Sequence, residues 1–349
     1  MASRPNFDWK IGLFITVAFL LITFTFYFYQ VTQTPNLQVD KPDTYLYIPT
    51  GATYATVMDS LKARQIIQDE LSFSFLAKLL KYQERVRPGR YRISKNMGNL
   101  RAVRMLRAGL QEPVKVTFNN VRLKEDLPPR ICRNLEADSV KFRQLVNDPE
   151  VVGKLGFDTV TIMTMFLPNT YELYWNTSAE ELLTRMHREY KRFWNEKRLA
   201  KAKAIGFTPA QVSVLASIIE AETNKNDEKP RMAGVYINRL TAEETNRRLQ
   251  ADPTLKFALK NFGIKRILNV HKDVDSPYNT YKYSGLPPGP INLPSTASLE
   301  AVLNREQHDY LYFCAKDDFS GYHAFAVTYA DHLANARLYQ AALDKRNIR

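Results

Sequence analysis

Cysteine is scarce in this sequence of 349 residues, and several familiar catalytic patterns are absent from it. Only Cys132 and Cys314 occur, far apart and in dissimilar contexts. Two such residues make neither a disulfide framework nor a metal site, so we expect two free thiols, no metal and no cofactor. The sequence has no Gly-rich phosphate loop, no CxxC pair and no HExxH motif. None of the five histidines stands in a nucleophile motif, which argues against nucleophilic hydrolysis.

Acidic residues are fewer than basic ones, with 36 Asp or Glu against 49 Lys or Arg and a formal net charge of +13. This excess indicates an anionic partner: nucleic acid, a membrane surface or an acidic polymer. Between Lys81 and Arg107, nine Lys or Arg accompany one acidic residue, Glu84. That segment is either a solvated basic face or a surface that attracts an acidic polymer or anionic lipid head groups.

One stretch, residues 11–29, has no charge in nineteen residues. It is long enough to cross a bilayer as a helix. Arg4 and Lys10 precede it and no Lys or Arg follows until Lys41, so the positive-inside rule predicts a cytoplasmic segment 1–10 and export of the remainder. A cleaved signal peptide is the alternative, but bulky residues stand where a cleavage site needs small ones. Export excludes nucleic acid as a partner.

The chain beyond this stretch is expected to be an α+β protein in two parts, because its length favours two domains. Residues 30–43 are polar and indicate a linker, 44–118 a small α+β domain, and 119–349 a larger one. Alternating patterns predict the strands Thr44–Ile48, Tyr91–Ile93, Val114–Phe118, Tyr310–Ala315 and Tyr322–Val327. Helical spacing predicts the helices Ala55–Gln65, Leu71–Tyr82, Leu100–Leu110, Ala179–Lys203 and Tyr329–Leu343.

The stretch Thr208 to Thr223 is the most informative helix of the larger part. Thr208 can cap its amides, Pro209 suits its first position, and Gln211 completes a capping box. Helical spacing predicts an apolar stripe formed by Val212, Leu215, Ala216 and Ile219. It also predicts a separate polar stripe formed by Ser213, Ser217, Glu220 and Asn224.

Two glutamates end this helix, and each is a candidate acid. Glu220 lies at the edge of the buried face, where partial desolvation would raise its pKa and suit it to general acid catalysis. Glu222 lies about 200° further round, so the two side chains cannot point into one cleft from a regular helix. On geometry alone either carboxylate could instead simply solvate the helix end.

Turn-rich loops follow this helix and carry the other polar candidates. Proline makes such loops rigid, so that they hold polar groups in place without regular structure. Tyrosines for sugar stacking and amides for sugar hydroxyls, beside a single carboxyl acid, suit carbohydrate cleavage.

Several motifs together resemble the YceG-like (MltG-type) endolytic murein transglycosylases. They are LASIIEAET, VYINRL, LQADPT, SPYNTY, GLPPGPI, YLYF and HAF, in order from Leu215 to Phe325. PGRY at Pro88 to Tyr91 and FLPNTYE at Phe166 to Glu172 are also similar to that family. The sequence departs from the family at Met163-Thr164, where Glu-Gly is usual, and at Asn304-Arg305, where Asn-Pro is common.

The resemblance implies a single-pass enzyme of the bacterial inner membrane whose catalytic domain lies in the periplasm. It implies a small LysM-like membrane-proximal domain followed by a mixed α/β lytic-transglycosylase-like catalytic domain. Such an enzyme cuts the bond between MurNAc and GlcNAc within nascent peptidoglycan strands and leaves 1,6-anhydro ends, and peptidoglycan synthases are candidate partners. The motif match assigns the catalytic acid to Glu220 and leaves Glu222 a structural role.

The remaining site candidates are substrate-binding residues in these motifs. They are Ser217, Asn224, Gln250, Asp252, Tyr278, Asn279, Thr280 and His323. Gln250 and Asp252 either bond the sugar or order their loop, and His323 is either a sugar contact or a satisfied core histidine. Two other functions stay open: a hydrolytic muramidase with the same acid and a held water, and a non-catalytic glycan-binding scaffold of cell-wall synthesis.

Overall fold

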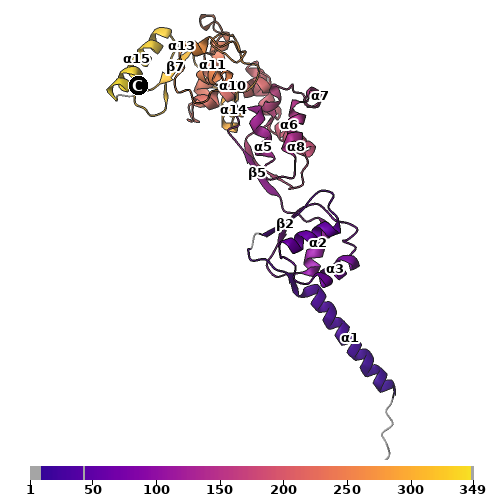
Figure 1. Ribbon diagram of the computed structural model, residues 1–349. Helices are drawn as coiled ribbons and strands as arrows, with labels where there is room; N and C mark the ends of the chain where they lie inside the picture. The colour runs from indigo at the N-terminus through magenta and orange to yellow at the C-terminus, as the bar shows by residue number, and fades with distance from the viewer. Residues whose placement is uncertain (1–8, 42–43, 347–349) are drawn as a thin grey trace, which may run out of the picture. The chain divides into compact units, whose positions relative to one another are not determined.

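The computed structural model describes residues 9–41 and 44–346. Residues 1–8, most of the expected cytoplasmic segment, lie outside this description, as do 42–43 and 347–349. The chain forms two compact units (Figure 1). The small unit extends to Lys115 and includes the short segments Asn134–Glu136 and Glu172–Thr177. The large unit comprises Val116–Arg133, Ala137–Tyr171 and Ser178 onward.

The small unit begins with a long apolar helix, α1 (Trp9–Gln33) (Figure 1). The predicted helix over 11–29 is therefore confirmed, and it is longer at both ends. Among the described residues it is the one helix that is by itself long and apolar enough to cross a membrane. Its side chains are exposed or half-buried as far as Gln30, whereas Val31 and Thr32 in its last turn are buried.

The segment expected to be a linker, 30–43, instead contributes to the small unit. The strand β1 (Pro35–Leu37) pairs antiparallel with β4 (Met97–Gly98). Leu37 is fully buried, and Val39 is also buried in the core of this unit. The polar composition suggested a linker because the two apolar residues that pack inward are separated by exposed or polar ones.

A β-α-α-β arrangement forms the body of the small unit. β2 (Thr44–Ile48) and β3 (Gly89–Ile93) pair antiparallel, with α2 (Tyr54–Ala63) and α3 (Glu70–Leu79) between them in the chain. The helix α4 (Asn99–Ala108) follows β4. The expected strands and helices of this region are confirmed to within a few residues. Two of the helices have a clear local start signal, since Thr53 caps α2 and Asp69 caps α3.

Short helices open the large unit after β5 (Val114–Phe118), which pairs with β6 (Asn169–Leu173). They are η1 (Lys124–Asp126), α5 (Leu127–Ile131), α6 (Ser139–Asn147), α7 (Pro149–Lys154) and η2 (Thr161–Met165). The long helix expected over 179–203 is wrong, because α8 (Ala179–Phe193) ends before α9 (Glu196–Ala204). Asn195 interrupts it by accepting a hydrogen bond from the Arg198 amide at 3.1 Å, which caps α9.

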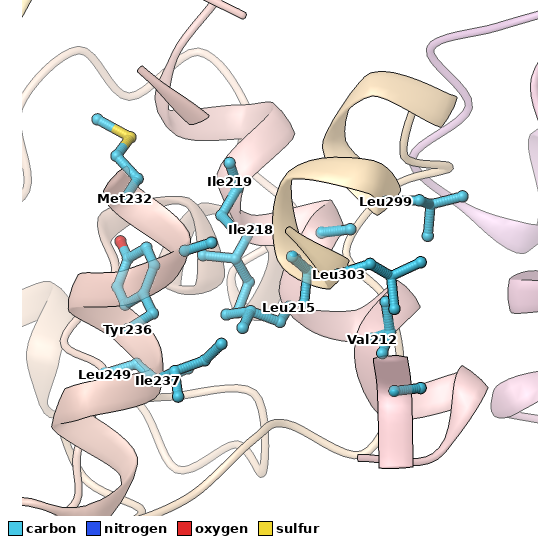
Figure 2. Packing of buried hydrophobic residues seen from close by; sticks show 14 of the residues in the cluster. Val212, Leu215, Ile218, Ile219, Met232, Tyr236, Ile237, Leu249, Leu299 and Leu303 are labelled. Atoms are coloured by element: carbon cyan, nitrogen blue, oxygen red, sulfur yellow. The ribbon is translucent and has the colours of Figure 1, made fainter. Parts of the chain in front are cut away.

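Three helices form the core that carries the candidate site. They are α10 (Pro209–Glu222), α11 (Lys229–Thr241) and α14 (Thr296–Leu303). Figure 2 shows Leu215 and Ile218 of α10 between Tyr236 of α11 and Leu303 of α14. Every residue of α10 from 212 to 219 is buried, so the helix is enclosed on all sides up to its last turn.

The remaining elements surround this core. They are η3 (Glu243–Thr245), α12 (Asp252–Ala258), α13 (Asn269–Lys272), the antiparallel hairpin β7 (Tyr312–Ala315) and β8 (His323–Ala326), and α15 (Tyr329–Lys345). The predicted hairpin and the closing helix are confirmed. Between α12 and α14 the chain is mostly loop, and this loop contains several of the residues proposed for the site.

Candidate active site

The helix α10 places both candidate glutamates in its last turn. Thr208 and Gln211 form the predicted capping box, in which Gln211 N donates to Thr208 Oγ1 and Thr208 N donates to Gln211 Oε1. The predicted polar stripe is wrong for its two serines, because both are buried. Ser213 donates to the Pro209 carbonyl and Ser217 to the Val214 carbonyl, so each hydroxyl is satisfied within the helix.

Glu220 is held by a set of cationic and hydroxyl donors. The Lys229 ammonium lies 3.1 Å from its Oε2, and the Lys229 side chain is only 4% exposed. The hydroxyls of Ser295 and Ser298, at the start of α14, donate to the same oxygen at 2.6 and 2.5 Å. Three donors therefore converge on one carboxylate oxygen.

This environment determines the protonation of Glu220. Desolvation by burial raises its pKa, but the hydrogen bonds from Ser295, Ser298 and Lys229 and the Lys229 charge together outweigh it, so the pKa is lowered. The expectation of a raised pKa at this position is therefore wrong. Glu220 is a carboxylate at neutral pH, and its Oε2 atom already accepts hydrogen bonds from Lys229, Ser295 and Ser298.

A cavity of about 610 Å³ adjoins Glu220. Asn224, a predicted substrate contact, also lines it, and so do the basic side chains Arg122, Arg130 and Lys256. Asn224 is exposed. Both residues are therefore accessible from this cavity, although Glu220 itself is only 24% exposed.

Glu222 faces a different and larger cavity of about 1040 Å³. The prediction that the two glutamates do not share a cleft is confirmed, since each lines only one of these two cavities. The Tyr236 hydroxyl donates to Glu222 Oε1 at 2.6 Å. In the part of the chain that the structure describes, no lysine or arginine forms an ion pair with it.

The surroundings of Glu222 favour its protonated form. Desolvation by burial is the main cause that raises its pKa to about 7, and the nearby charge of Asp252 raises it further. The Tyr236 hydrogen bond and the Lys256 charge act in the opposite direction and do not compensate. A carboxyl group with this pKa exchanges a proton readily near neutral pH, as a general acid must.

Two loops hold the polar groups that surround Glu222. Gln250 N donates to the Thr280 carbonyl at 3.1 Å, and Ala251 N donates to the Thr280 hydroxyl at 3.0 Å. The Tyr281 hydroxyl donates to Asp252 Oδ1 at 2.5 Å. These bonds join the LQADPT segment to the YNTY segment, and they present Gln250, Asp252 and Tyr281 to the large cavity.

Three residues that were predicted to contact substrate are buried, and their hydrogen bonds hold neighbouring segments of the site together. Ser217 is fully buried and accepts a hydrogen bond from Ile291 N at 3.0 Å. Asn279 is also fully buried, and its amide donates to the carbonyls of Lys272 and Val274. Thr280 is 2% exposed and bonds to Thr254. The expectation that they contact substrate does not fit this burial, because their polar atoms face the protein.

Tyr278 and His323 lie outside both cavities. The Tyr278 ring packs on Phe257 at a centroid distance of 4.7 Å. His323 Nδ1 lies 2.8 Å from Glu228 Oε2, and His323 N donates to the other oxygen of the same carboxylate. The alternative of a satisfied histidine therefore describes His323 better than a sugar contact does.

Several aromatic and basic residues that were not predicted line the large cavity, and four of them matter for the site. They are Tyr236, Arg239, Tyr281 and Tyr312. Arg239 is buried, and its guanidinium donates to Gln250 Oε1 at 2.6 Å and to the Arg248 carbonyl. Tyr236 and Arg239 both belong to the VYINRL motif, so the motif contained the signal even though helical spacing marked Tyr236 only as a core residue.

Comparison with known proteins matches most of the chain to one family. Residues 46–338 match the model of the YceG-like family. An endolytic murein transglycosylase of Bacillus subtilis (strain 168) is 26% identical over an alignment of 308 residues that covers 84% of this chain and 83% of that protein. An endolytic murein transglycosylase of Streptococcus pneumoniae serotype 2 is 24% identical and covers 92% of this chain. The chain matches 63% of that relative's length.

A solved structure resembles the fold as well. It is the crystal structure of a yceG-like protein from Listeria monocytogenes, with a TM-score of 0.55 and 26% sequence identity. The match covers 84% of this chain and 99% of the Listeria chain. The similarity therefore extends over both units rather than over an isolated motif.

Proposed function

The chain belongs to the YceG-like family, and on that premise we propose that it is an endolytic murein transglycosylase that cuts peptidoglycan strands internally. Its curated relatives carry that name. The observation that carries the proposal is a carboxyl group of raised pKa, Glu222, on the wall of a cavity lined by tyrosines and polar side chains. A single acid beside stacking rings suits the cleavage of a glycan.

We infer that Glu222, rather than Glu220, is the catalytic acid. The motif resemblance assigned this role to Glu220. A general acid must hold a proton before it reacts, and the donors around Glu220 favour the carboxylate, whereas burial beside Asp252 favours protonated Glu222. The role proposed for Glu220 is structural: it joins α10 to Lys229 and to the first turn of α14.

The reaction can proceed with this one carboxyl group. Protonated Glu222 donates its proton to the glycosidic oxygen between MurNAc and GlcNAc while the bond from that oxygen to C1 breaks. As the ring becomes oxocarbenium-like, the Glu222 carboxylate takes the proton of the sugar's own 6-hydroxyl, and that oxygen closes on C1. The product is a 1,6-anhydro end, and the second carboxylate of ordinary glycosidases is not needed.

The side chains around Glu222 have distinct roles in this proposal. The Tyr236 hydroxyl orients Glu222 through its hydrogen bond. Burial keeps the pKa of Tyr236 well above its usual value, so that the phenol remains a donor. Gln250, whose amide oxygen is held by Arg239, offers its amide nitrogen to sugar hydroxyls. The rings of Tyr281 and Tyr312 line the same cavity and offer faces on which sugars can stack.

The helix α1 supports a proposed placement in the cell membrane. It is long and apolar enough to span a bilayer, and Arg4 and Lys10 precede its charge-free stretch, so the chain beyond α1 would lie on the exported side. The β-α-α-β order of the small unit supports its identification as a LysM-like domain. A tether of this kind would keep the large unit near growing strands and the synthases that make them.

Product analysis tests the proposed reaction. Purified peptidoglycan is digested with the full chain, and the fragments are separated and weighed. We expect internal fragments with 1,6-anhydro ends, each one water lighter than the reducing-end form. Reducing ends would identify a hydrolytic muramidase, and intact strands that nevertheless bind the protein would identify a glycan-binding scaffold.

A reporter fusion tests the proposed placement separately. A reporter joined after Arg349 is expected to be active only in the exported compartment. Activity of the same fusion in the cytoplasm would reject this orientation and would leave the reaction chemistry unaffected.

A further inference from the structure

The small unit contains a basic groove of about 500 Å³ that the proposed reaction does not use. It lies between the end of β3, the start of α4 and the segment after α4. Arg92, Lys95 and Arg101 contribute positive charge to it. The apolar part of its wall is formed by Met97, Met105 and Leu110. The groove therefore presents cations beside an apolar surface.

Only part of the positive charge in this groove is offset by a carboxylate. Glu112 lines it too, and its Oε1 lies 3.8 Å from an Arg92 guanidinium nitrogen. In the part of the chain that the structure describes, no carboxylate pairs with Lys95 or Arg101, and both side chains are exposed. Ser94 Oγ also lines the groove and is buried without a hydrogen-bond partner among the described residues. Two exposed cations are thus available to an anion.

Buried polar bonds attach the wall of this groove to the end of α1. Met97 pairs across the β1–β4 ladder with Leu37, four residues after α1 ends. Asn99, at the start of α4, donates to the Val31 carbonyl of α1 at 3.0 Å and accepts a bond from Asn36 at 2.7 Å. Asn99 is 1% exposed. The groove is therefore held at a set position relative to the last turn of α1.

The length of α1 indicates where the groove lies relative to the bilayer. Its 25 residues measure about 37 Å, whereas the hydrocarbon core of a bilayer is about 30 Å thick. The end of α1 then lies in the head-group layer, and the groove beside it lies there as well. We propose that this groove binds the phosphate head group of an anionic phospholipid. The proposal rests on the membrane placement proposed above and is independent of the reaction.

The two surfaces of the groove fit the two parts of such a lipid. Lys95 and Arg101 bind the phosphate. Met105 and Leu110 contact the glycerol and the first carbons of the acyl chains. A cationic side chain near an anionic bilayer surface favours binding about fivefold. A groove with two such cations therefore selects phosphatidylglycerol over phosphatidylcholine.

Lipid retention by the full chain tests this site. The chain is reconstituted in phosphatidylcholine nanodiscs that contain phosphatidylglycerol as a minor lipid, and the lipids retained after gentle release are counted by native mass spectrometry. We expect clear enrichment of phosphatidylglycerol. The double variant Lys95→Gln/Arg101→Gln should reduce this enrichment about tenfold or more, since each cation contributes about fivefold.

A matched variant separates the groove from general charge. Arg104 and Arg107 are exposed on the same helix but do not line the groove. Arg104→Gln/Arg107→Gln removes the same charge and should change the enrichment about twofold or less, because salt screens charges that lie away from the groove. Unchanged thermal unfolding of both variants establishes that each is folded.

Four outcomes would overturn the proposal. Equal losses in the two double variants would indicate a diffuse basic surface, and a wild-type chain without enrichment would show that the groove selects no lipid. Displacement of phosphatidylglycerol by millimolar inorganic phosphate would identify free phosphate as the ligand. Failure of the chain to enter nanodiscs would refute the membrane placement itself, together with this inference.

Discussion

Glu220 and Glu222 lie two residues apart at the end of one helix, yet their surroundings shift the pKa values of the two carboxyl groups in opposite directions. The first has a buried ammonium and two hydroxyls directed at one oxygen, and its pKa is lowered. The second has one phenol donor and a nearby aspartate, and its pKa is raised to about 7. Both side chains are partly exposed, so burial alone does not distinguish them. The difference comes from the neighbours supplied by other elements.

This comparison shows how a helix end can divide structural and chemical roles between similar residues. A carboxylate with several donors is a stable ionic link between α10, α11 and α14. A carboxyl group with few donors and a cavity in front of it can exchange a proton with a bound molecule. Because the two side chains point about 200° apart, one helix can hold the ionic link on one side and the proton-exchanging carboxyl group on the other.

The largest expected effect is a difference in catalytic rate between variants of the two glutamates. Glu222→Gln keeps the volume of the side chain but cannot donate a proton, so the initial rate of strand cleavage should fall about 10²–10⁴-fold. Glu220→Gln should retain most of the activity of the folded protein. Binding of strands to both variants, measured by co-sedimentation, is the control. If the Glu220→Gln protein is folded but inactive while the Glu222→Gln protein is active, Glu220 is the catalytic acid and the assignment to Glu222 is wrong.

The next largest effect concerns the ion pair of Glu220. Lys229→Met leaves a partly buried carboxylate without its cation, and breaking a buried pair costs about 3–5 kcal/mol of the free energy of unfolding. The matched control is Arg231→Met, two residues along α11. Arg231 pairs with Glu306 at 3.0 Å on the surface, where such a pair is worth about 1 kcal/mol or less. Urea unfolding that finds equal losses would mean that the Lys229 pair is not structural.

The pH dependence of stability should have opposite signs for the two glutamates. Folded Glu222 has a pKa of about 7 against 4.5 for an ordinary glutamate, so the folded state binds more protons between these values. The contribution of Glu222 to wild-type stability therefore decreases as pH rises from about 4.5 to about 7. Glu222→Gln lacks this decrease and should be about 3 kcal/mol more stable than wild type at pH 8.

Glu220→Gln should show the reverse behaviour in the same measurement. Its lowered pKa stabilises the wild-type fold above the unfolded value of 4.5, and this contribution disappears as pH falls through the folded pKa. The variant should thus be less stable than wild type at pH 8 and approach it in acid. Two parallel curves of stability against pH would contradict the assignment of charge states to these residues.

The smallest expected effect concerns the hydroxyl that orients Glu222. Tyr236→Phe removes one hydrogen bond and should cost about 1 kcal/mol of the free energy of unfolding. Because this bond lowers the pKa of Glu222, its loss should move the alkaline limb of the pH–rate profile to higher pH. Tyr312→Phe, in the same cavity but bonded to Glu244, should leave the limb in place. A shift common to both variants would exclude a specific role for Tyr236.

Local signals in the sequence predicted the elements that hold the site. The charge-free run predicted α1, and Thr208 with Gln211 predicted the start of α10, because hydrophobic length and capping bonds depend on neighbouring residues only. The same reasoning failed for α8 and α9. The periodic pattern continues across Asn195, and only the observed capping bond shows that the helix restarts there.

Side-chain roles in the loops were predicted less well than the loops themselves. LQADPT and YNTY do meet, and Gln250 and Asp252 line the large cavity as expected of site residues. Within YNTY, however, Asn279 and Thr280 are buried, and Tyr281 is the residue that lines the cavity. A turn without regular periodicity does not indicate which of its side chains point outward.

By itself the sequence determined the apolar helix, the caps and order of the main elements, and the 200° between Glu220 and Glu222. Only the tertiary structure decided which glutamate is charged. Ser295 and Ser298, which surround Glu220, lie more than 70 residues further along the chain, and Asp252, which raises the pKa of Glu222, lies in another helix. Helical geometry depends on residues close in sequence, whereas a pKa depends on desolvation and charges that reach the group only after folding.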